Sequence, residues 1–167
     1  MIDKTQFEKI LLKWLRDFLS SHYTDYSVDV IVATSSISRL SDPNIKNSIP
    51  NYSFFDFTPH VLGILKHKKI SNKVELAFLN RSISPISLKE IGEMQSYCRL
   101  ANPIAAFLVS TKGLPQEINK LLFDDKISSD LLDYSKDKNI TIFSWNEKIN
   151  APDPQSVFPI KKESSNG

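Results

Sequence analysis

The stretch TPHVLGILKHKKISNKVELAFLNR (residues 58–81) decides the fold of this chain. Its apolar residues fall in two short runs, at 61–65 and 74–79, and a lysine-rich segment at 66–73 separates them. Short apolar runs bounded by polar turn residues are typical of β-strands. The pattern therefore predicts two adjacent strands joined by a basic turn.

Glu75 stands inside the second apolar run. An ionised carboxylate is costly to bury without a partner, so Glu75 lies either on an exposed face of the strand or in a functional site. Side chains two residues apart on a strand share one face. We therefore expect Glu75, Ala77 and Arg81 to point to the same side of the sheet.

The composition is that of an ordinary globular domain. The chain has 167 residues, of which 41% are hydrophobic and 24% are charged, and this length suits one domain. No apolar run approaches the roughly 20 residues of a membrane-spanning helix, and the charged N-terminus does not resemble a signal peptide. We expect a cytoplasmic protein without membrane contact, and we expect its single cysteine, Cys98, to be a small core residue.

The net charge of +2 does not by itself call for nucleic acid. The basic turn nevertheless gathers four lysines: Lys66, Lys68, Lys69 and Lys73. Such a cluster contacts phosphates when it lies beside a binding cleft, and otherwise it is a solvated turn. Both interpretations remain open from the sequence.

Periodicity and capping signals predict the other elements. The predicted order is a helix at 2–22, a strand at 27–35, a loop at 36–50 with one helical turn after Pro43, an extended lead-in at 52–57, the two strands above, a helix at 88–100, a strand at 104–110, helices at 115–123 and 127–136, and a strand at 139–145. This order implies a mixed α/β sheet with helices on both faces. We expect one domain over residues 1–145 and an irregular tail over 146–167.

The order α-β-β-β-α-β resembles the restriction-endonuclease-like fold of the PD-(D/E)XK nuclease superfamily. The resemblance covers roughly residues 7–145, and it is carried by FEKILLKWL, SVDVIVATSS, TPHVLGIL, KVELAFLNR and ISLKEIGEMQSYCRLANPIAAFLVST. It implies a mixed sheet with an αβββαβ core flanked by helices. It also implies a site for metal-dependent phosphodiester hydrolysis.

The motif of that superfamily is altered here. In an active member the second strand begins with Pro-Asp, and the third carries Glu or Asp, a spacer and Lys. Here Pro59 is followed by His60, Glu75 keeps the acidic position, and Ala77 stands in place of the lysine. Magnesium prefers oxygen ligands, and the lysine assists the attacking water. The resemblance therefore implies a degenerate site that needs no cofactor.

An active enzyme with relocated ligands is the alternative. In that case Glu75, His60 and Asp56 converge on Mg²⁺ or Mn²⁺, although imidazole suits other transition metals better than magnesium. Glu90 and Glu93 lie on the following helix, where we interpret Glu93 as a solvated carboxylate.

Two further residues are candidates for contact with nucleic acid. Arg81 offers a positive charge to phosphate. Gln95, with Tyr97, resembles the Gln and Tyr that some nuclease families of this fold place near DNA.

Three functions remain open. The favoured one is a degenerate nuclease-like module that binds nucleic acid or a protein partner in DNA processing or defence. The second is a metal-dependent endonuclease with relocated ligands. The third is an unrelated α/β domain that acts only through protein contacts.

Overall fold

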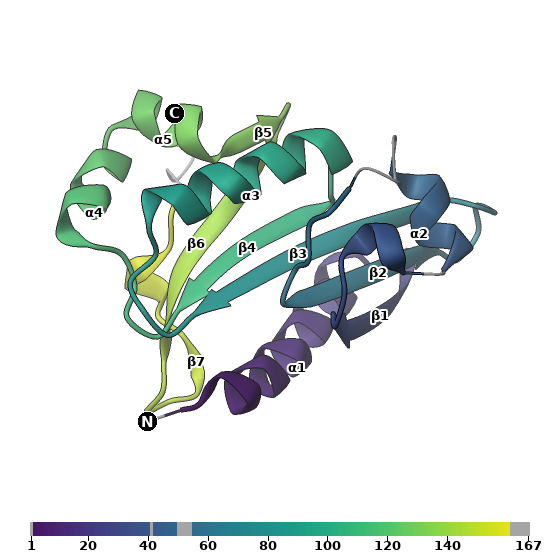
Figure 1. Ribbon diagram of the computed structural model, residues 1–167, viewed down its shortest axis with the longest axis horizontal. Helices are drawn as coiled ribbons and strands as arrows, with labels where there is room; N and C mark the ends of the chain where they lie inside the picture. The colour runs from purple at the N-terminus through teal and green to yellow at the C-terminus, as the bar shows by residue number, and fades with distance from the viewer. Residues whose placement is uncertain (1, 41, 50–54, 161–167) are drawn as a thin grey trace, which may run out of the picture.

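The computed structural model describes residues 2–40, 42–49 and 55–160, which form a mixed sheet with helices on both faces (Figure 1). These residues supply seven strands, six of them in the order β1-β2-β3-β4-β6-β5, and β7 pairs with β6. The elements are α1 (Lys4–His22), β1 (Tyr26–Val32), η1 (Ile37–Arg39), α2 (Pro43–Ser48), β2 (Val61–His67), β3 (Val74–Ser82), α3 (Leu88–Ala101), β4 (Ala105–Ser110), α4 (Gln116–Leu122), α5 (Asp125–Leu132), β5 (Asp133–Ser135), β6 (Lys138–Asn146), β7 (Ala151–Pro152) and η3 (Pro154–Ser156). The predicted α/β class is confirmed.

The sheet is antiparallel in its first half and parallel in its centre. β2 runs antiparallel to both β1 and β3, whereas β4 runs parallel to both β3 and β6. Parallel neighbours need a crossover connection, usually a helix, and α3 provides it between β3 and β4. The predicted order of the main elements is confirmed, and the helical turn predicted after Pro43 is α2. The helix predicted at 127–136 is wrong at its end, because α5 stops at Leu132 and β5 follows it; β7 is an addition.

α1 covers one face of the sheet. It begins with a capping box, in which the Asp3 carboxylate accepts from the Gln6 backbone N–H and the Gln6 side chain accepts from the Asp3 N–H. Its buried residues recur every fourth position: Phe7, Leu11, Leu15 and Leu19. Gly63 lets the helix approach β2 closely, because a Cβ at Gly63 would lie only 2.7 Å from Leu19 Cδ1.

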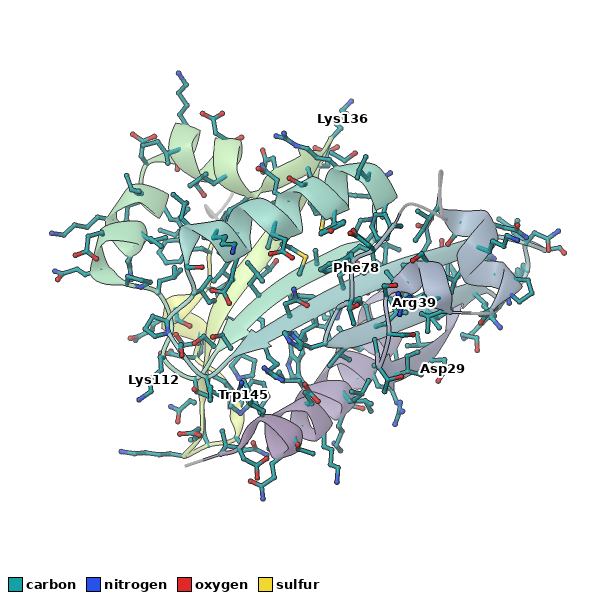
Figure 2. All side chains as sticks on the ribbon, in the orientation of Figure 1. Asp29, Arg39, Phe78, Lys112, Lys136 and Trp145 are labelled. Carbon is teal, nitrogen blue, oxygen red and sulfur yellow. The ribbon has the colours of Figure 1, made fainter. Side chains whose placement is uncertain are left out.

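α2 and α3 cover the opposite face. α3 begins with the predicted capping box between Ser87 and Glu90. Its buried residues Ile91, Met94 and Cys98 belong to the same core cluster as Phe78 of β3, which lies in the layer between the sheet and α3 (Figure 2). Cys98 is confirmed as a buried core residue, and burial raises the pKa of its thiol.

The β2–β3 hairpin has two chemically different ends. Val61 pairs with Leu79 at one end, and Lys66 pairs with Val74 at the other, next to the turn. β2 is seven residues long, which corresponds to about 20 Å at the usual rise of a strand. The hairpin therefore separates its turn from the segment that leads into β2 by nearly the length of the sheet.

The C-terminal segment differs from the predicted irregular tail. β7 and η3 follow β6, and the backbone groups of Phe158 exchange two hydrogen bonds with those of Ile142, each 2.8 Å long. Phe158 is buried against the sheet. Of the predicted lead-in at 52–57, residues 52–54 lie outside the described residues, as do 161–167 of the tail.

Candidate functional site

A cavity of about 410 Å³ opens where β2 begins and β3 ends, beside α3. Its volume falls within the range of about 300–1,000 Å³ that is usual for small-ligand sites. The residues around it come from the segment before β2, from β3 and β4, from the connection to α3, and from α3 itself: Asp56, Phe57, Thr58, His60, Asn80, Arg81, Ser82, Ile86, Glu90, Glu93, Tyr97, Leu108 and Val109.

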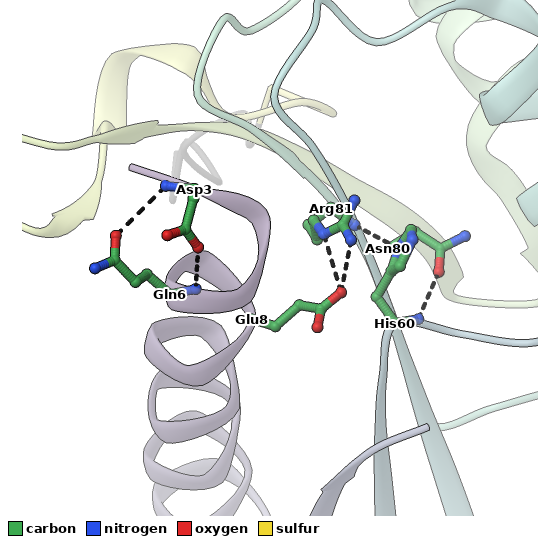
Figure 3. Close-up of polar contacts among 6 residues, drawn as sticks. All are labelled: Asp3, Gln6, Glu8, His60, Asn80 and Arg81. Carbon is green, nitrogen blue, oxygen red and sulfur yellow. Dashed lines mark hydrogen bonds and ion pairs between the residues drawn. The ribbon is translucent and has the colours of Figure 1, made fainter. Parts of the chain in front are cut away.

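His60 and Asn80 use their polar groups to hold the ends of β2 and β3 together (Figure 3). The His60 backbone N–H donates to Asn80 Oδ1 at 3.1 Å, and the Arg81 backbone N–H donates to His60 Nδ1 at 3.1 Å. Because Nδ1 accepts a hydrogen bond, the ring is neutral with its proton on Nε2. Burial lowers the pKa of His60, and the charge of the nearby Arg81 lowers it further.

Arg81 is held by Glu8 of α1 (Figure 3). Its Nε and Nη2 atoms donate to Glu8 Oε1 at 3.1 Å and 2.6 Å. The two side chains are only 14% and 19% exposed, so solvent screens the pair weakly. The guanidinium that we expected to meet phosphate is therefore largely engaged within the protein.

Carboxylates dominate the charge around the cavity. Asp56, Glu90 and Glu93 are acidic, and Arg81 is the basic side chain among the described lining residues. Glu90 accepts from the Ser87 N–H at 2.7 Å as part of the helix cap. Because Arg81 is already paired with Glu8, the lining has a negative balance.

Tyr97 links the acidic rim to an aromatic wall. Its hydroxyl donates to Asp56 Oδ1 at 2.6 Å, and its ring stacks on Phe57 with 4.5 Å between the centroids. The hydrogen bond to Asp56, with smaller effects of burial and of the charges on Asp56 and Glu93, raises the pKa of Tyr97 to about 12. Asp56 thus lies at the cavity with Tyr97 as a defined hydrogen-bond donor.

Glu75 does not join this cavity, so it does not converge with His60 and Asp56 as the active-enzyme alternative requires. It pairs with Leu65, whereas His60 directly precedes Val61 at the far end of β2. Five residues along a strand correspond to about 17 Å. No group of three or more His, Cys, Asp or Glu among the described residues is placed to hold a metal ion.

The strand register shows which residues lie beside His60. Val61 pairs with Leu79, so the next position of β3, Asn80, faces His60, and Ser82 follows on the same face of the strand. The Ser82 hydroxyl donates to the Ser84 carbonyl at 2.8 Å. Ala77 is buried on the α1 side of the sheet, away from this position.

The lysine turn, residues 66–73, forms the opposite end of the β2–β3 hairpin. Lys66, Lys68, Lys69 and Lys73 are exposed there. His67 shapes the turn, because its Nδ1 accepts from the backbone N–H groups of Lys69 and Ile70. Lys68 Nζ donates to the Thr24 carbonyl at 2.9 Å, and Lys73 Nζ lies 5.9 Å from the centroid of the Tyr26 ring. The turn thus holds its cations at the surface.

A smaller cavity of about 240 Å³ adjoins this turn. It is lined by amide, hydroxyl and ammonium groups of α2 and the hairpin, with one aliphatic residue: Asn44, Asn47, Ser48, Asn72, Lys73 and Val74. Such groups donate hydrogen bonds to phosphate and sugar oxygens. Asn44 and Asn47 were not candidates from the sequence, because only the fold brings α2 beside the turn.

Gln95 has a role within the fold. Its side-chain amide donates to the backbone carbonyls of Asp130 and Asp133 at 2.7 Å and 3.0 Å. Gln95 therefore joins α3 to the end of α5, and it is absent from the cavity lining. On α3, the cavity residues are Glu90, Glu93 and Tyr97, which share one helix face through spacings of three and four.

Comparison with known proteins adds no family to this description. No protein-family model matches the chain, and no curated protein matches it. Within the described residues, no helix is both long enough and apolar enough to cross a membrane.

Proposed function

We propose that this chain is a nucleic-acid-binding domain of nuclease-like architecture that does not cleave its ligand. The observation that carries the proposal is the opposite charge of the two ends of the β2–β3 hairpin. Exposed lysines occupy the turn, whereas carboxylates surround the cavity at the other end. A polyanion is attracted to the first end and repelled by the second.

The nuclease-like architecture rests on the resemblance described above. The order of α1, β1, β2, β3, α3 and β4 agrees with the αβββαβ core of the restriction-endonuclease-like fold. In that fold the catalytic groups lie at the start of the second strand and on the third strand. The cavity is at the corresponding end of β2 and β3, which makes it the equivalent of a nuclease active site in this proposal.

The register changes which residues stand at the motif positions. In this proposal His60 stands in the place of the aspartate, and the residues facing it are Asn80 and, two positions on, Ser82. All three motif positions are then altered, because none of these residues is a carboxylate or a lysine. Glu75, the expected surviving acid, lies outside the cavity.

The side chains at the three altered positions also form hydrogen bonds with the protein backbone. His60 Nδ1 and Asn80 Oδ1 accept from backbone N–H groups, and the Ser82 hydroxyl donates to a backbone carbonyl. These bonds fix the strand ends. A hard cation such as Mg²⁺ prefers several oxygen ligands, including carboxylates, which these positions no longer offer. Binding without cleavage follows as the proposed activity.

A cleavage and binding assay tests this function. Purified protein is incubated with single-stranded and duplex DNA and RNA, in Mg²⁺ and in Mn²⁺, and binding is followed by fluorescence anisotropy. We expect binding that weakens as salt is added, with intact oligonucleotides in both metals. Absence of binding at low salt would contradict the proposal, as would metal-dependent cleavage.

One observation favours a second candidate, a metal-dependent hydrolase with relocated ligands. Asp56, Glu90 and Glu93 all line the cavity, and carboxylate oxygens suit Mg²⁺ and Mn²⁺. As described, these side chains are not grouped closely enough to hold a metal ion, so this candidate requires them to converge when a cation binds. In this candidate Glu93 is the central ligand, because Glu90 caps α3 and Asp56 accepts from Tyr97. Cleavage that disappears in Glu93→Gln but persists in Glu117→Gln, an exposed carboxylate on α4, would select it over the first.

A further inference from the structure

The cavity beside α3 combines three surfaces that suit one kind of side chain. Its floor is apolar, since Ile86, Leu108 and Val109 are buried residues that line it. Its wall is aromatic, formed by Phe57 and Tyr97 in a stacked pair. Its rim is acidic. A cationic head group on an apolar stem satisfies all three surfaces together.

The charges around the cavity determine whether it favours a cationic or an anionic ligand. Between the described residues, no hydrogen bond is found to Glu93 or to Asp56 Oδ2, and Asp56 Oδ1 accepts from Tyr97. The basic lining residue Arg81 is neutralised by Glu8, and His60 is neutral. A cation therefore enters the cavity with favourable electrostatics, whereas a phosphate meets net repulsion.

The shape of the site favours a guanidinium over an ammonium. Arginine presents a planar head that stacks on aromatic rings and bonds carboxylates in a bidentate manner, whereas lysine presents a compact and strongly hydrated charge. The stacked pair of Phe57 and Tyr97 offers the aromatic surface, and Glu93 offers a carboxylate one turn before Tyr97 on α3. Both features lie on the same cavity.

We propose that this cavity binds an arginine side chain presented by a protein partner. The stem of the arginine lies along Leu108 and Ile86, and its head lies between Glu93 and Asp56 beside the Tyr97 ring. The site is independent of the proposed nucleic-acid contact, since it lies at the other end of the hairpin. The domain would then join a nucleic acid at its basic end to a protein at its acidic end.

A titration with capped amino acids tests the site. N-acetyl-arginine methylamide and its neutral isostere, N-acetyl-citrulline methylamide, are added to isotope-labelled protein while backbone amide resonances are recorded. We expect the arginine probe to shift resonances of residues 56–60, 80–82 and 90–97, and the citrulline probe to leave them unchanged. Equal shifts with both probes would overturn the proposal, as would shifts confined to other residues.

Matched carboxylate variants then locate the contact. Glu93→Gln removes the charge and keeps the shape of the side chain. We expect it to lower the affinity for the arginine probe about tenfold, which is the effect of losing one charged hydrogen bond. Glu117→Gln changes an exposed carboxylate on α4 and leaves affinity unchanged. An equal loss in both variants, or no loss in Glu93→Gln, would refute the site. The oligonucleotide assay reports separately on the proposed function.

Discussion

The lysine turn and the cavity beside α3 lie at the two ends of one β-hairpin, and they differ in the charge and the exposure of their polar side chains. At the turn, the charged heads of four lysines are exposed. At the cavity, His60, Asn80 and Arg81 are engaged with other groups of the protein, and the uncompensated charge is acidic. The contrast shows that one hairpin can present exposed cations at its turn and an acidic, largely bonded set of side chains at its other end.

The largest expected effect concerns the salt dependence of nucleic-acid binding. Each lysine that contacts a phosphate contributes about 0.9 to the slope of log affinity against log salt, so four contacts predict an affinity loss of about 100-fold between about 50 and about 200 mM salt. Replacing Lys66, Lys68, Lys69 and Lys73 by Gln should remove most of this slope. The measurement is a series of binding isotherms at increasing salt.

The matched control for this experiment is Asp56→Asn with Glu93→Gln, which neutralises the cavity end. We expect the slope to persist in that variant, because its substitutions are far from the turn. A slope that survives in the lysine variant would show that phosphates are bound elsewhere.

A medium effect is expected at the ion pair beside the cavity. Glu8→Gln leaves the largely buried Arg81 without its counter-charge, and we expect a loss of about 1–3 kcal/mol in the free energy of unfolding. Lys13→Gln is the control, because the Lys13–Asp17 pair on the same helix is 79% and 65% exposed and should cost less than about 0.5 kcal/mol. Chemical denaturation measures both. Equal losses would mean that burial does not distinguish the two pairs.

The smallest effect is a pH dependence at Tyr97. Because the pKa of Tyr97 is raised, its hydrogen bond to Asp56 stabilises the folded state fully below about pH 10, the ordinary pKa of tyrosine. This stabilisation is lost as the pH rises through about 12. Asp56→Asn should lower the pKa of Tyr97, as followed by tyrosinate absorbance. Tyr97→Phe shows which part of the absorbance change comes from Tyr97. An unchanged Tyr97 titration in Asp56→Asn would show that Asp56 does not control the pKa of this phenol.

Much of the fold was predictable because its signals are local. The fourfold spacing of Phe7, Leu11 and Leu15 indicates a helix, and the pattern of Ser87 and Glu90 marks where α3 begins. Such signals depend on a few neighbouring residues and on hydrogen bonds within one turn. The extra strand β7 was missed because a two-residue strand has no periodicity of its own.

The site was less predictable because it depends on strand register. Leu76, Ala77 and Phe78 are all buried, since helices cover both faces of the sheet, so no alternation of polar and apolar residues marks the pairing. Glu75 was assigned to the site on this account, whereas Asn80 faces His60. Glu93 and Tyr97 line the cavity because α3 packs beside the sheet, and this contact joins parts of the chain that are distant in sequence.

The most direct measurement is the footprint of a nucleic acid on the protein. A short DNA duplex is added to isotope-labelled protein at low salt, and the amide resonances that shift are assigned. The opposite charges of the two ends predict shifts at residues 66–73 and in the adjoining α2 (Pro43–Ser48), with little change at 90–97. A footprint centred on residues 56–60 and 90–97 would contradict the account, because the acidic cavity would then be the nucleic-acid site.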